Sequence, residues 1–226
     1  MTNTLTIASH GKSMTADWYA PTTASGLVVI AYGSDGLTDN LSGPWATMIR
    51  GYAEALAEKG FTVLIPDYLA ITGTQPGPGV FAVIPNRRAD WEGAISDAID
   101  YAITLPTVDP KRVGLLGFSL GGHLSLRLRA KAKVLVEYFA PTLDGIGSGG
   151  NLTHAQIHHG EADRVPGTGF PNAGAIAEIL KREGTSTEVF PYPGAGHGFI
   201  GEDAANKSAR DLSKERTLAF FQAHLS

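Results

Sequence analysis

Apolar and polar positions alternate in blocks along most of the chain. Short, continuous apolar runs, such as residues 27–31 and 61–65, are typical of strands buried on both faces of a sheet. Longer segments carry apolar residues at helical spacing, such as residues 44–59, which are followed by Gly60 as a helix-ending residue. Strands that alternate with helices predict an α/β protein with a mostly parallel, twisted sheet and helices on both faces.

The same patterns predict the other elements. We expect strands at residues 5–8, 14–19, 27–31, 61–65, 112–116, 133–139, 155–159 and 186–192. We expect helices at residues 44–59, 87–105, 123–131, 173–182 and 207–225. The first two strands should form a hairpin. Residues 69–86 are rich in Gly and Pro and are expected to form a long loop, with Asn86 as the cap of the next helix.

Length and composition suit one domain spanning residues 1–226. The chain is 43% hydrophobic and 18% charged, as in soluble globular proteins. Its net charge of -4 provides no basic field for nucleic acid. No apolar run approaches the about 20 residues of a membrane span, and no signal peptide is visible. We therefore expect a cytoplasmic protein, or one from which a leader was removed, that is a monomer or homodimer without nucleic-acid or membrane partners.

The absence of cysteine narrows the chemistry further. With no cysteine in the chain, disulfides, thiolate metal sites and a cysteine nucleophile are excluded. Any covalent catalysis must therefore use another nucleophile.

The stretch Gly117-Phe118-Ser119-Leu120-Gly121-Gly122 lies between a predicted strand and a predicted helix. This is the context of the G-x-S-x-G nucleophile elbow, in which a serine occupies a strained turn. Glycines two residues before and after the serine remove Cβ groups that would collide with neighbouring elements. Ser119 is thus the candidate nucleophile, and the backbone N–H of Leu120 is expected to face the developing oxyanion.

A serine hydroxyl needs a base, and the base needs an acid to orient it. Asp163 follows one predicted strand, and His197 lies in a glycine-rich loop after another. The order Ser119, Asp163, His197 is that of α/β-hydrolases, and open α/β sheets hold their sites at the carboxyl ends of strands. Asp144, which follows the preceding strand, is the alternative acid.

The sequence resembles the dienelactone hydrolase family of α/β-hydrolases. The resemblance rests on Pro66-Asp67-Tyr68, residues 117–122, the His159-Gly160-Glu161-Ala162-Asp163 stretch with Val165-Pro166, and residues 194–199, and it covers nearly the whole chain from Leu27. It implies a three-layer α/β-hydrolase fold and hydrolysis of carboxylic esters or lactones without a cofactor. It also implies Ser119 as nucleophile, Asp163 as acid, His197 as base, and the Leu120 and Ser34 N–H groups as oxyanion donors.

Two departures from the family are linked. Members that act on dienelactone carry a cysteine nucleophile and a glutamate that holds the thiol, whereas this chain has Ser119 and Gly33 at those positions. The resemblance therefore leaves open whether dienelactone itself is a substrate. No cap domain is expected, because residues 141–152 are too few for a helical lid. Residues 69–86 should instead cover the site as a mobile flap.

The sequence suggests two sets of substrate-binding residues. Tyr32, Tyr68 and Phe199 flank the motif positions and are expected to line the pocket. Arg87 and Arg88 stand where a helix is predicted to begin, and cations there oppose the helix dipole. One of them could bind a substrate carboxylate. The alternative is internal pairing with Asp90, Asp67 or Glu92.

Other titratable residues have simpler interpretations. His154, His158 and His159 could suggest a metal site, but strand alternation separates the last two and no carboxylate cluster accompanies them. Packing or hydrogen bonding is the preferred interpretation, and no metal is expected. Glu137 lies within an apolar strand, so its carboxyl needs a partner, an arginine or solvent at the sheet edge.

These observations favour a serine hydrolase that cleaves esters or lactones with small acyl groups. A thioesterase or an acyl peptidase is an alternative within enzymes, although a peptidase of this fold normally carries a further N-terminal domain. A small-molecule receptor on the same fold is the alternative from another class, since fold alone does not determine function.

Overall fold

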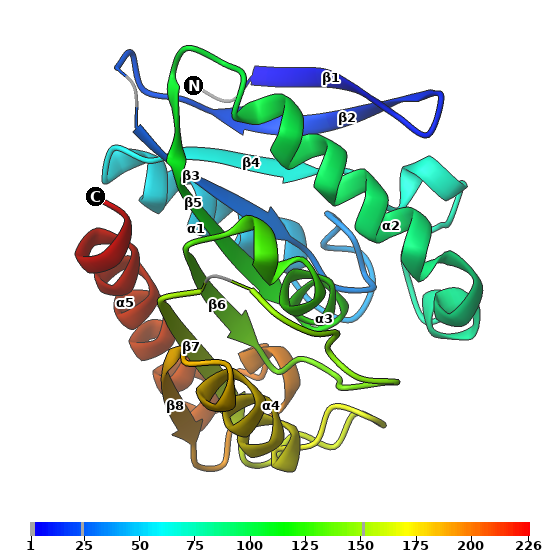
Figure 1. The fold of residues 1–226 in the computed structure, drawn as a ribbon. Coiled ribbons are helices and arrows are strands. Elements are labelled where there is room, and N and C mark those ends of the chain that lie inside the picture. The colour runs from blue at the N-terminus through cyan, green and yellow to red at the C-terminus, as the bar shows by residue number, and fades with distance from the viewer. Residues whose placement is uncertain (1–2, 24, 151) are drawn as a thin grey trace.

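The computed structural model describes residues 3–23, 25–150 and 152–226. Eight strands form one mixed, mostly parallel sheet in the order β1-β2-β4-β3-β5-β6-β7-β8 (Figure 1). The strands are β1 Asn3–Ser9, β2 Lys12–Tyr19, β3 Ser25–Ala31, β4 Thr62–Pro66, β5 Val108–Phe118, β6 Val134–Tyr138, β7 His154–Gly160 and β8 Ser186–Tyr192. β1 and β2 form the predicted antiparallel hairpin, β2 is antiparallel to β4, and all other pairs are parallel.

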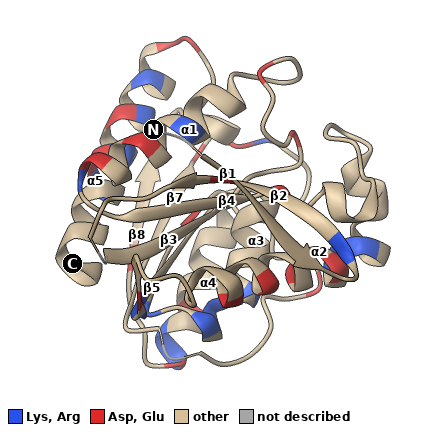
Figure 2. Cartoon of the chain, turned by 90° about the horizontal axis from the view of Figure 1, so that it is seen from above, with Lys and Arg blue, Asp and Glu red and all other residues tan. Residues whose placement is uncertain are grey.

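Helices cover both faces of the sheet, as predicted. Figure 2 shows α1 and α5 on one side of the strands and α2, α3 and α4 on the other. The α-helices of the described chain are α1 Trp45–Glu58, α2 Val80–Ala102, α3 Leu120–Arg127, α4 Pro171–Arg182 and α5 Ala204–Leu225. Short 3-10 helices are η1 Ala70–Thr72, η2 Arg129–Lys131 and η3 His197–Phe199. This three-layer arrangement is the α/β-hydrolase fold.

The central strands are buried because a layer of helices lies on each face. All seven residues of β3 are buried, as the continuous apolar run of residues 27–31 predicts. Between the sheet and the layer of α1 and α5, the Tyr138 hydroxyl contacts the Tyr52 hydroxyl at 2.9 Å and Thr217 Oγ1 at 2.7 Å. These bonds link β6 to both helices of that layer.

The predicted start of α2 is wrong. The helix begins at Val80 rather than after Asn86, and it includes Pro85. Proline removes one backbone donor but does not end a helix whose first turn is held by packing. Val80 and Ile84 are buried four residues apart on one face, and their burial anchors this turn.

The expected loop over residues 69–86 is therefore largely structured. It contains η1 and the first turns of α2. By contrast, the segment between β6 and β7 holds no helix in its described residues, 139–150 and 152–153. Among the described residues, no helix combines the length and apolar character needed to cross a membrane.

Candidate active site

Ser119 occupies a strained turn between β5 and α3. Its φ of 52° and ψ of -118° lie outside the regions that a non-glycine residue favours. Its backbone N–H donates to the Tyr138 carbonyl at 2.9 Å, which holds the turn against β6. A Cβ on Gly117 would lie 2.5 Å from the Gly121 carbonyl oxygen, and one on Gly121 would lie 2.0 Å from the Ala31 carbonyl oxygen. Glycine is thus required at both positions.

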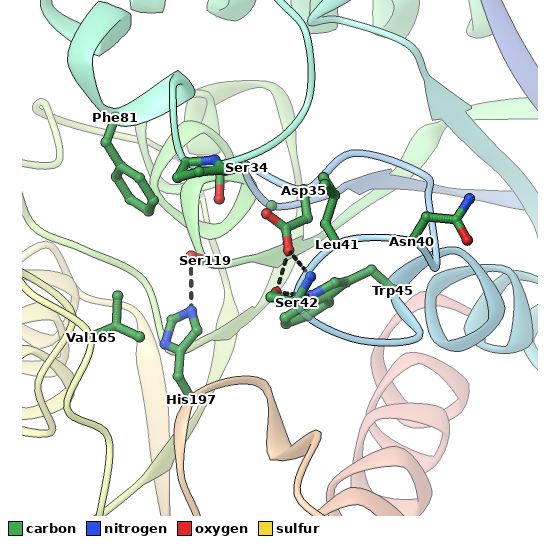
Figure 3. Close-up of a pocket in the computed structure, with 12 residues that line it drawn as sticks. Ser34, Asp35, Asn40, Leu41, Ser42, Trp45, Phe81, Ser119, Val165 and His197 are labelled. Carbon is green, nitrogen blue, oxygen red and sulfur yellow. Dashed lines mark hydrogen bonds between the residues drawn. The ribbon is translucent and has the colours of Figure 1, made fainter.

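His197 and Asp163 come together with Ser119 at the carboxyl edge of the sheet. Asp163 follows β7, and His197 follows β8 and opens η3. His197 Nε2 lies 3.1 Å from Ser119 Oγ, and His197 Nδ1 lies 2.8 Å from Asp163 Oδ2 (Figure 3 shows the first contact). With Nδ1 donating to the carboxylate, Nε2 is free to accept the serine proton.

Asp163 is held in its ionised form. Burial raises the pKa of its carboxyl, but contacts with the His159 and His197 rings and the Val165 N–H outweigh burial and hold the pKa well below its usual range. Oδ1 accepts from the Val165 N–H at 2.9 Å and from Thr168 Oγ1 at 3.1 Å. His159 Nε2 lies 3.3 Å from Oδ2, the oxygen that also contacts His197. The carboxylate is therefore fixed from several sides.

A cavity of about 550 Å³ opens in front of Ser119 and His197 (Figure 3). Its walls come from the loop after β3, the start of α1, the segment that leads into α2, and the loop after β7. The lining residues are Gly33, Ser34, Asp35, Asn40, Leu41, Ser42, Trp45, Pro78, Phe81, Ser119, Val165 and His197. Residues 69–86 were expected to cover the site, and two of them do reach the cavity: Pro78 from the turn that leads into α2, and Phe81 from the first turn of α2 itself.

The loop after β3 reaches Ser119 where an oxyanion donor is expected. Ser34 lines the cavity, and a Cβ on Gly33 would lie 3.3 Å from Ser119 Cβ. Gly33 thus stands beside the nucleophile, where the resemblance places a glutamate in members that act on dienelactone. Leu120 is the first residue of α3, and N–H groups in the first turn of a helix have no acceptor within the helix. The two backbone donors remain a prediction.

The expectation that Tyr32, Tyr68 and Phe199 line the pocket is wrong. All three are almost fully buried, and none contributes to the cavity wall. Tyr32 and Tyr68 stack with ring centroids 4.4 Å apart; the Tyr32 hydroxyl donates to Asp67 Oδ1 at 2.6 Å, and the Tyr68 hydroxyl donates to the Tyr32 carbonyl at 2.7 Å. Phe199 packs edge-on against Phe139. Proximity to a motif in sequence did not place these rings at the cavity, because they point into the core.

Arg87 and Arg88 also lie outside the cavity. Neither is at the helix start, because α2 begins at Val80, so the helix-dipole argument does not apply. Arg87 lies 3.8 Å from Asp90, while Arg88 contacts Glu92 at 3.1 Å and also pairs with Asp144. The internal pairing that sequence analysis kept as the alternative is the arrangement found, with Asp144 as an additional partner.

Asp144 does not contact the imidazole of the site. Its side chain is 62% exposed and pairs with Arg88, whereas Asp163 contacts His197 at 2.8 Å. The geometry thus favours Asp163 over Asp144 as the orienting acid.

The three histidines of the β7 region are separated as strand alternation predicts. His154 stacks on His224 with ring centroids 3.9 Å apart, and His158 Nδ1 lies 2.8 Å from the Tyr192 hydroxyl. His159 lies beside Asp163. Within the described part of the chain, no group of three or more His, Asp or Glu side chains is arranged to hold a metal ion.

The front of the cavity was not predicted. Asp35, Asn40, Leu41, Ser42 and Trp45 line it, yet no sequence motif marks them. Their position in the sequence is the one feature that could have pointed to them, because they follow the first buried strand, where the second oxyanion donor was expected.

Comparison with known proteins identifies relatives of this chain and solved structures that share its fold. A curated relative, the carboxymethylenebutenolidase of Rhodococcus opacus, is 29% identical over 203 residues, covering 78% of this chain and 76% of the relative. The crystal structure of the dienelactone hydrolase-like promiscuous phosphotriesterase P91, from metagenomic libraries, superposes with a TM-score of 0.81 at 19% identity over 100% of this chain and 99% of that one. Est1E from Butyrivibrio proteoclasticus superposes with a TM-score of 0.69 at 17% identity over 98% of each chain.

The family assignment follows from the extent of the match rather than from the site alone. The family model described as "Dienelactone hydrolase family" matches residues 18–225. This range includes the Ser119 elbow, the Asp163 loop and the His197 loop. The chain belongs to the dienelactone hydrolase family of hydrolases.

Proposed function

We propose that this protein hydrolyses carboxylic esters or lactones with small acyl groups through an acyl-enzyme intermediate on Ser119. The contact that carries the proposal is that of His197 Nε2 with Ser119 Oγ at 3.1 Å, with Nδ1 held by Asp163 at 2.8 Å. This arrangement supplies what acyl transfer requires: a nucleophile, a base that takes its proton and an acid that orients the base. The relative named carboxymethylenebutenolidase supports an ester or lactone as substrate.

The proposed chemistry has two halves. Ser119 Oγ attacks the carbonyl carbon while His197 Nε2 takes its proton, and the Leu120 and Ser34 N–H groups stabilise the oxyanion. His197 then gives the proton to the leaving oxygen, and the acyl group remains on Ser119. In the second half, water attacks the acyl carbon, with His197 again acting first as base and then as acid. The carboxylate of Asp163 stabilises the imidazolium in both halves.

The cavity favours a neutral substrate. Leu41, Trp45, Phe81 and Val165 give it apolar walls. Of the residues that line the cavity, Asp35 is the single one whose type is Asp, Glu, Lys or Arg. A carboxylate-bearing ester would meet this like charge without a cation to balance it. We therefore propose short, neutral esters or lactones, rather than the acidic substrates that Arg87 and Arg88 suggested from sequence.

Ester turnover combined with active-site labelling tests the function. The wild-type protein is expected to hydrolyse p-nitrophenyl acetate and butyrate and to lose this activity when a fluorophosphonate labels Ser119. Peptide mass spectrometry would locate the label. A protein that binds such esters without turnover, or a label on another residue, would contradict the proposal and favour a binding protein on the same fold.

Charge selectivity is a separate prediction. We expect kcat/KM to be about tenfold higher for p-nitrophenyl butyrate than for mono-p-nitrophenyl succinate, because the carboxylate of the second ester is repelled by Asp35. Asp35→Asn should narrow this ratio. Asp90→Asn removes a negative charge outside the cavity and serves as the control, and Arg88→Ala should leave the ratio unchanged. If Arg88→Ala instead lowered kcat/KM selectively for the acidic substrate, that arginine would again be a candidate for binding the substrate carboxylate.

A further inference from the structure

Two peptide groups of the loop after β3 are held in fixed orientations beside Ser119. The Gly36 N–H donates to the Gly33 carbonyl at 3.1 Å, which closes a four-residue turn. The Gly77 N–H, from the segment that leads into α2, donates to the Ser34 carbonyl at 2.9 Å. The loop that passes the nucleophile is therefore tied both to itself and to the segment before α2.

The first of these bonds orients the Ser34 N–H. The Gly33 carbonyl and the Ser34 N–H belong to one peptide group, and the described chain contains no cis peptide bond, so the two groups point in opposite directions. Because the carbonyl is bonded to Gly36 inside the turn, the N–H points out of the turn. Ser34 is 9% exposed, yet its N–H donates to no acceptor among the described residues. A nearly buried donor without a partner is thus available to a substrate oxygen.

Side-chain hydrogen bonds fasten the next residue of the turn, Asp35, to the start of α1. Trp45 Nε1 donates to Ser42 Oγ at 2.9 Å, and Ser42 Oγ donates to Asp35 Oδ2 (Figure 3). The Ser42 N–H donates to the same carboxylate oxygen at 3.2 Å. Trp45 is the first residue of α1. We call Asp35, Ser42 and Trp45 the loop clamp, because together they join the turn to a helix.

The Trp45 end of the loop clamp is fixed beside His197. A Cβ on Gly198 would lie 2.5 Å from Trp45 Cη2, so the indole lies directly against the backbone of the residue after His197. The indole is buried and packs edge-on against Phe139, whose ring centroid lies 4.6 Å from that of His197. A ring packed in this way cannot move without displacing its neighbours. Trp45 is therefore a firm support for Ser42.

We propose that Asp35 is a positioning residue for the oxyanion donor of Ser34. Through Ser42 and Trp45, its carboxylate fixes the turn in which it directly follows Ser34, so that the Ser34 N–H faces the oxyanion before the reaction begins. The acceptor oxygen of Asp35 carries this role rather than its charge, because both of its partners are donors from Ser42. This inference rests on the proposed acyl transfer at Ser119.

Two substitutions of Asp35 test the loop clamp. In Asp35→Ala we expect kcat for p-nitrophenyl butyrate to fall roughly tenfold, less than for outright loss of an oxyanion donor, because the N–H is displaced and not removed. KM should stay within about twofold of wild type, since an oxyanion donor acts mainly in the transition state. Asp35→Asn keeps an oxygen that can accept from Ser42 and should return kcat toward wild type. A kcat as low in Asp35→Asn as in Asp35→Ala would overturn the inference.

Asp39→Ala is the matched control in the same segment. Asp39 lies outside the cavity wall and is also bonded to the start of α1, with Oδ1 accepting from the Thr47 N–H at 3.0 Å and Oδ2 from Thr47 Oγ1 at 2.6 Å. Its loss should lower the thermal unfolding temperature about as much as Asp35→Ala does, but leave kcat unchanged. Equal losses of kcat in the two alanine variants, or a loss in Asp35→Ala that appears in KM alone, would describe a purely structural aspartate and overturn the inference.

Butylboronic acid provides a readout that needs no turnover. It forms a tetrahedral adduct with a reactive serine, and one oxygen of this adduct occupies the position of the oxyanion. Its dissociation constant should rise roughly tenfold in Asp35→Ala and stay near the wild-type value in Asp39→Ala. An equal affinity of Asp35→Ala and wild type for this acid would overturn the inference.

The Ser34 N–H itself can be followed by NMR of protein labelled with ¹⁵N-serine. Its signal is assigned from its absence in Ser34→Ala. On formation of the boronic acid adduct, the amide proton should move downfield in the wild type and move less in Asp35→Ala. The same movement in both proteins would overturn the inference. Absent ester turnover in the wild type would overturn the proposed function, whereas the Ser34 signal would still decide whether Asp35 positions this N–H.

Discussion

Replacing Ser119 by alanine is expected to lower kcat for p-nitrophenyl acetate by about 10⁴ or more. The hydroxyl is the group proposed to form the acyl intermediate, and among the described residues Ser119 is the one serine hydrogen-bonded to His197. The substitution removes one oxygen, and the hydrogen bond from the Ser119 backbone N–H to Tyr138 that holds the turn is kept. Thermal unfolding should therefore change little while turnover is lost.

Ser125→Ala is the matched control for this experiment. Ser125 is a buried serine on the same α3 helix, and its hydroxyl has no hydrogen-bond partner among the described residues. Its loss should leave kcat close to the wild-type value. Near-wild-type esterase activity in Ser119→Ala would contradict the proposed mechanism, and equal losses in both variants would indicate a defect of the helix instead.

The elbow could be predicted from sequence because its constraints are local. The strained φ of Ser119 and the close contacts that require glycine at Gly117 and Gly121 involve the six residues of the elbow and the strands beside them. Asp163 and His197 could be predicted because each follows a strand of the parallel sheet, and such strands end at one edge. The contact distances then depend on the strand order, which the sequence pattern alone did not give.

The pocket wall could not be predicted because it depends on long-range packing. The sequence pattern predicts a helix that begins after Asn86, yet burial of Val80 and Ile84 extends α2 to residues before Pro85. Because α2 begins earlier than predicted, Arg87 and Arg88 do not lie at the helix start. The helix-dipole argument for an acidic substrate therefore no longer applies. Aromatic residues beside motifs were assigned to the pocket, but their direction is set by the core around them.

Asp163→Asn should be the second most damaging change, with an expected loss in kcat of about 10⁴. An asparagine that directs its NH₂ at His197 Nδ1 would place the imidazole proton on Nε2. Nε2 would then be unable to accept the serine proton. The same change removes a carboxylate whose pKa is lowered in the folded protein. Such a group stabilises the fold above its unfolded-state pKa, and this stability is lost as pH falls through the folded-state pKa. Thermal unfolding at neutral pH should therefore also occur at a lower temperature in the variant.

Asp144→Asn separates the two acids that the sequence offered. Asp144 is exposed and pairs with Arg88, and an exposed ion pair contributes about 1 kcal/mol or less to stability. Its loss should leave kcat within about twofold of wild type, since a surface charge outside the cavity changes the barrier by only a few tenths of a kcal/mol. The comparison is made on kcat, because the two aspartates differ in their contact with the base and not in their contact with substrate. A larger loss in Asp144→Asn than in Asp163→Asn would move the orienting acid to Asp144 and would require the loop after β6 to approach His197 during turnover.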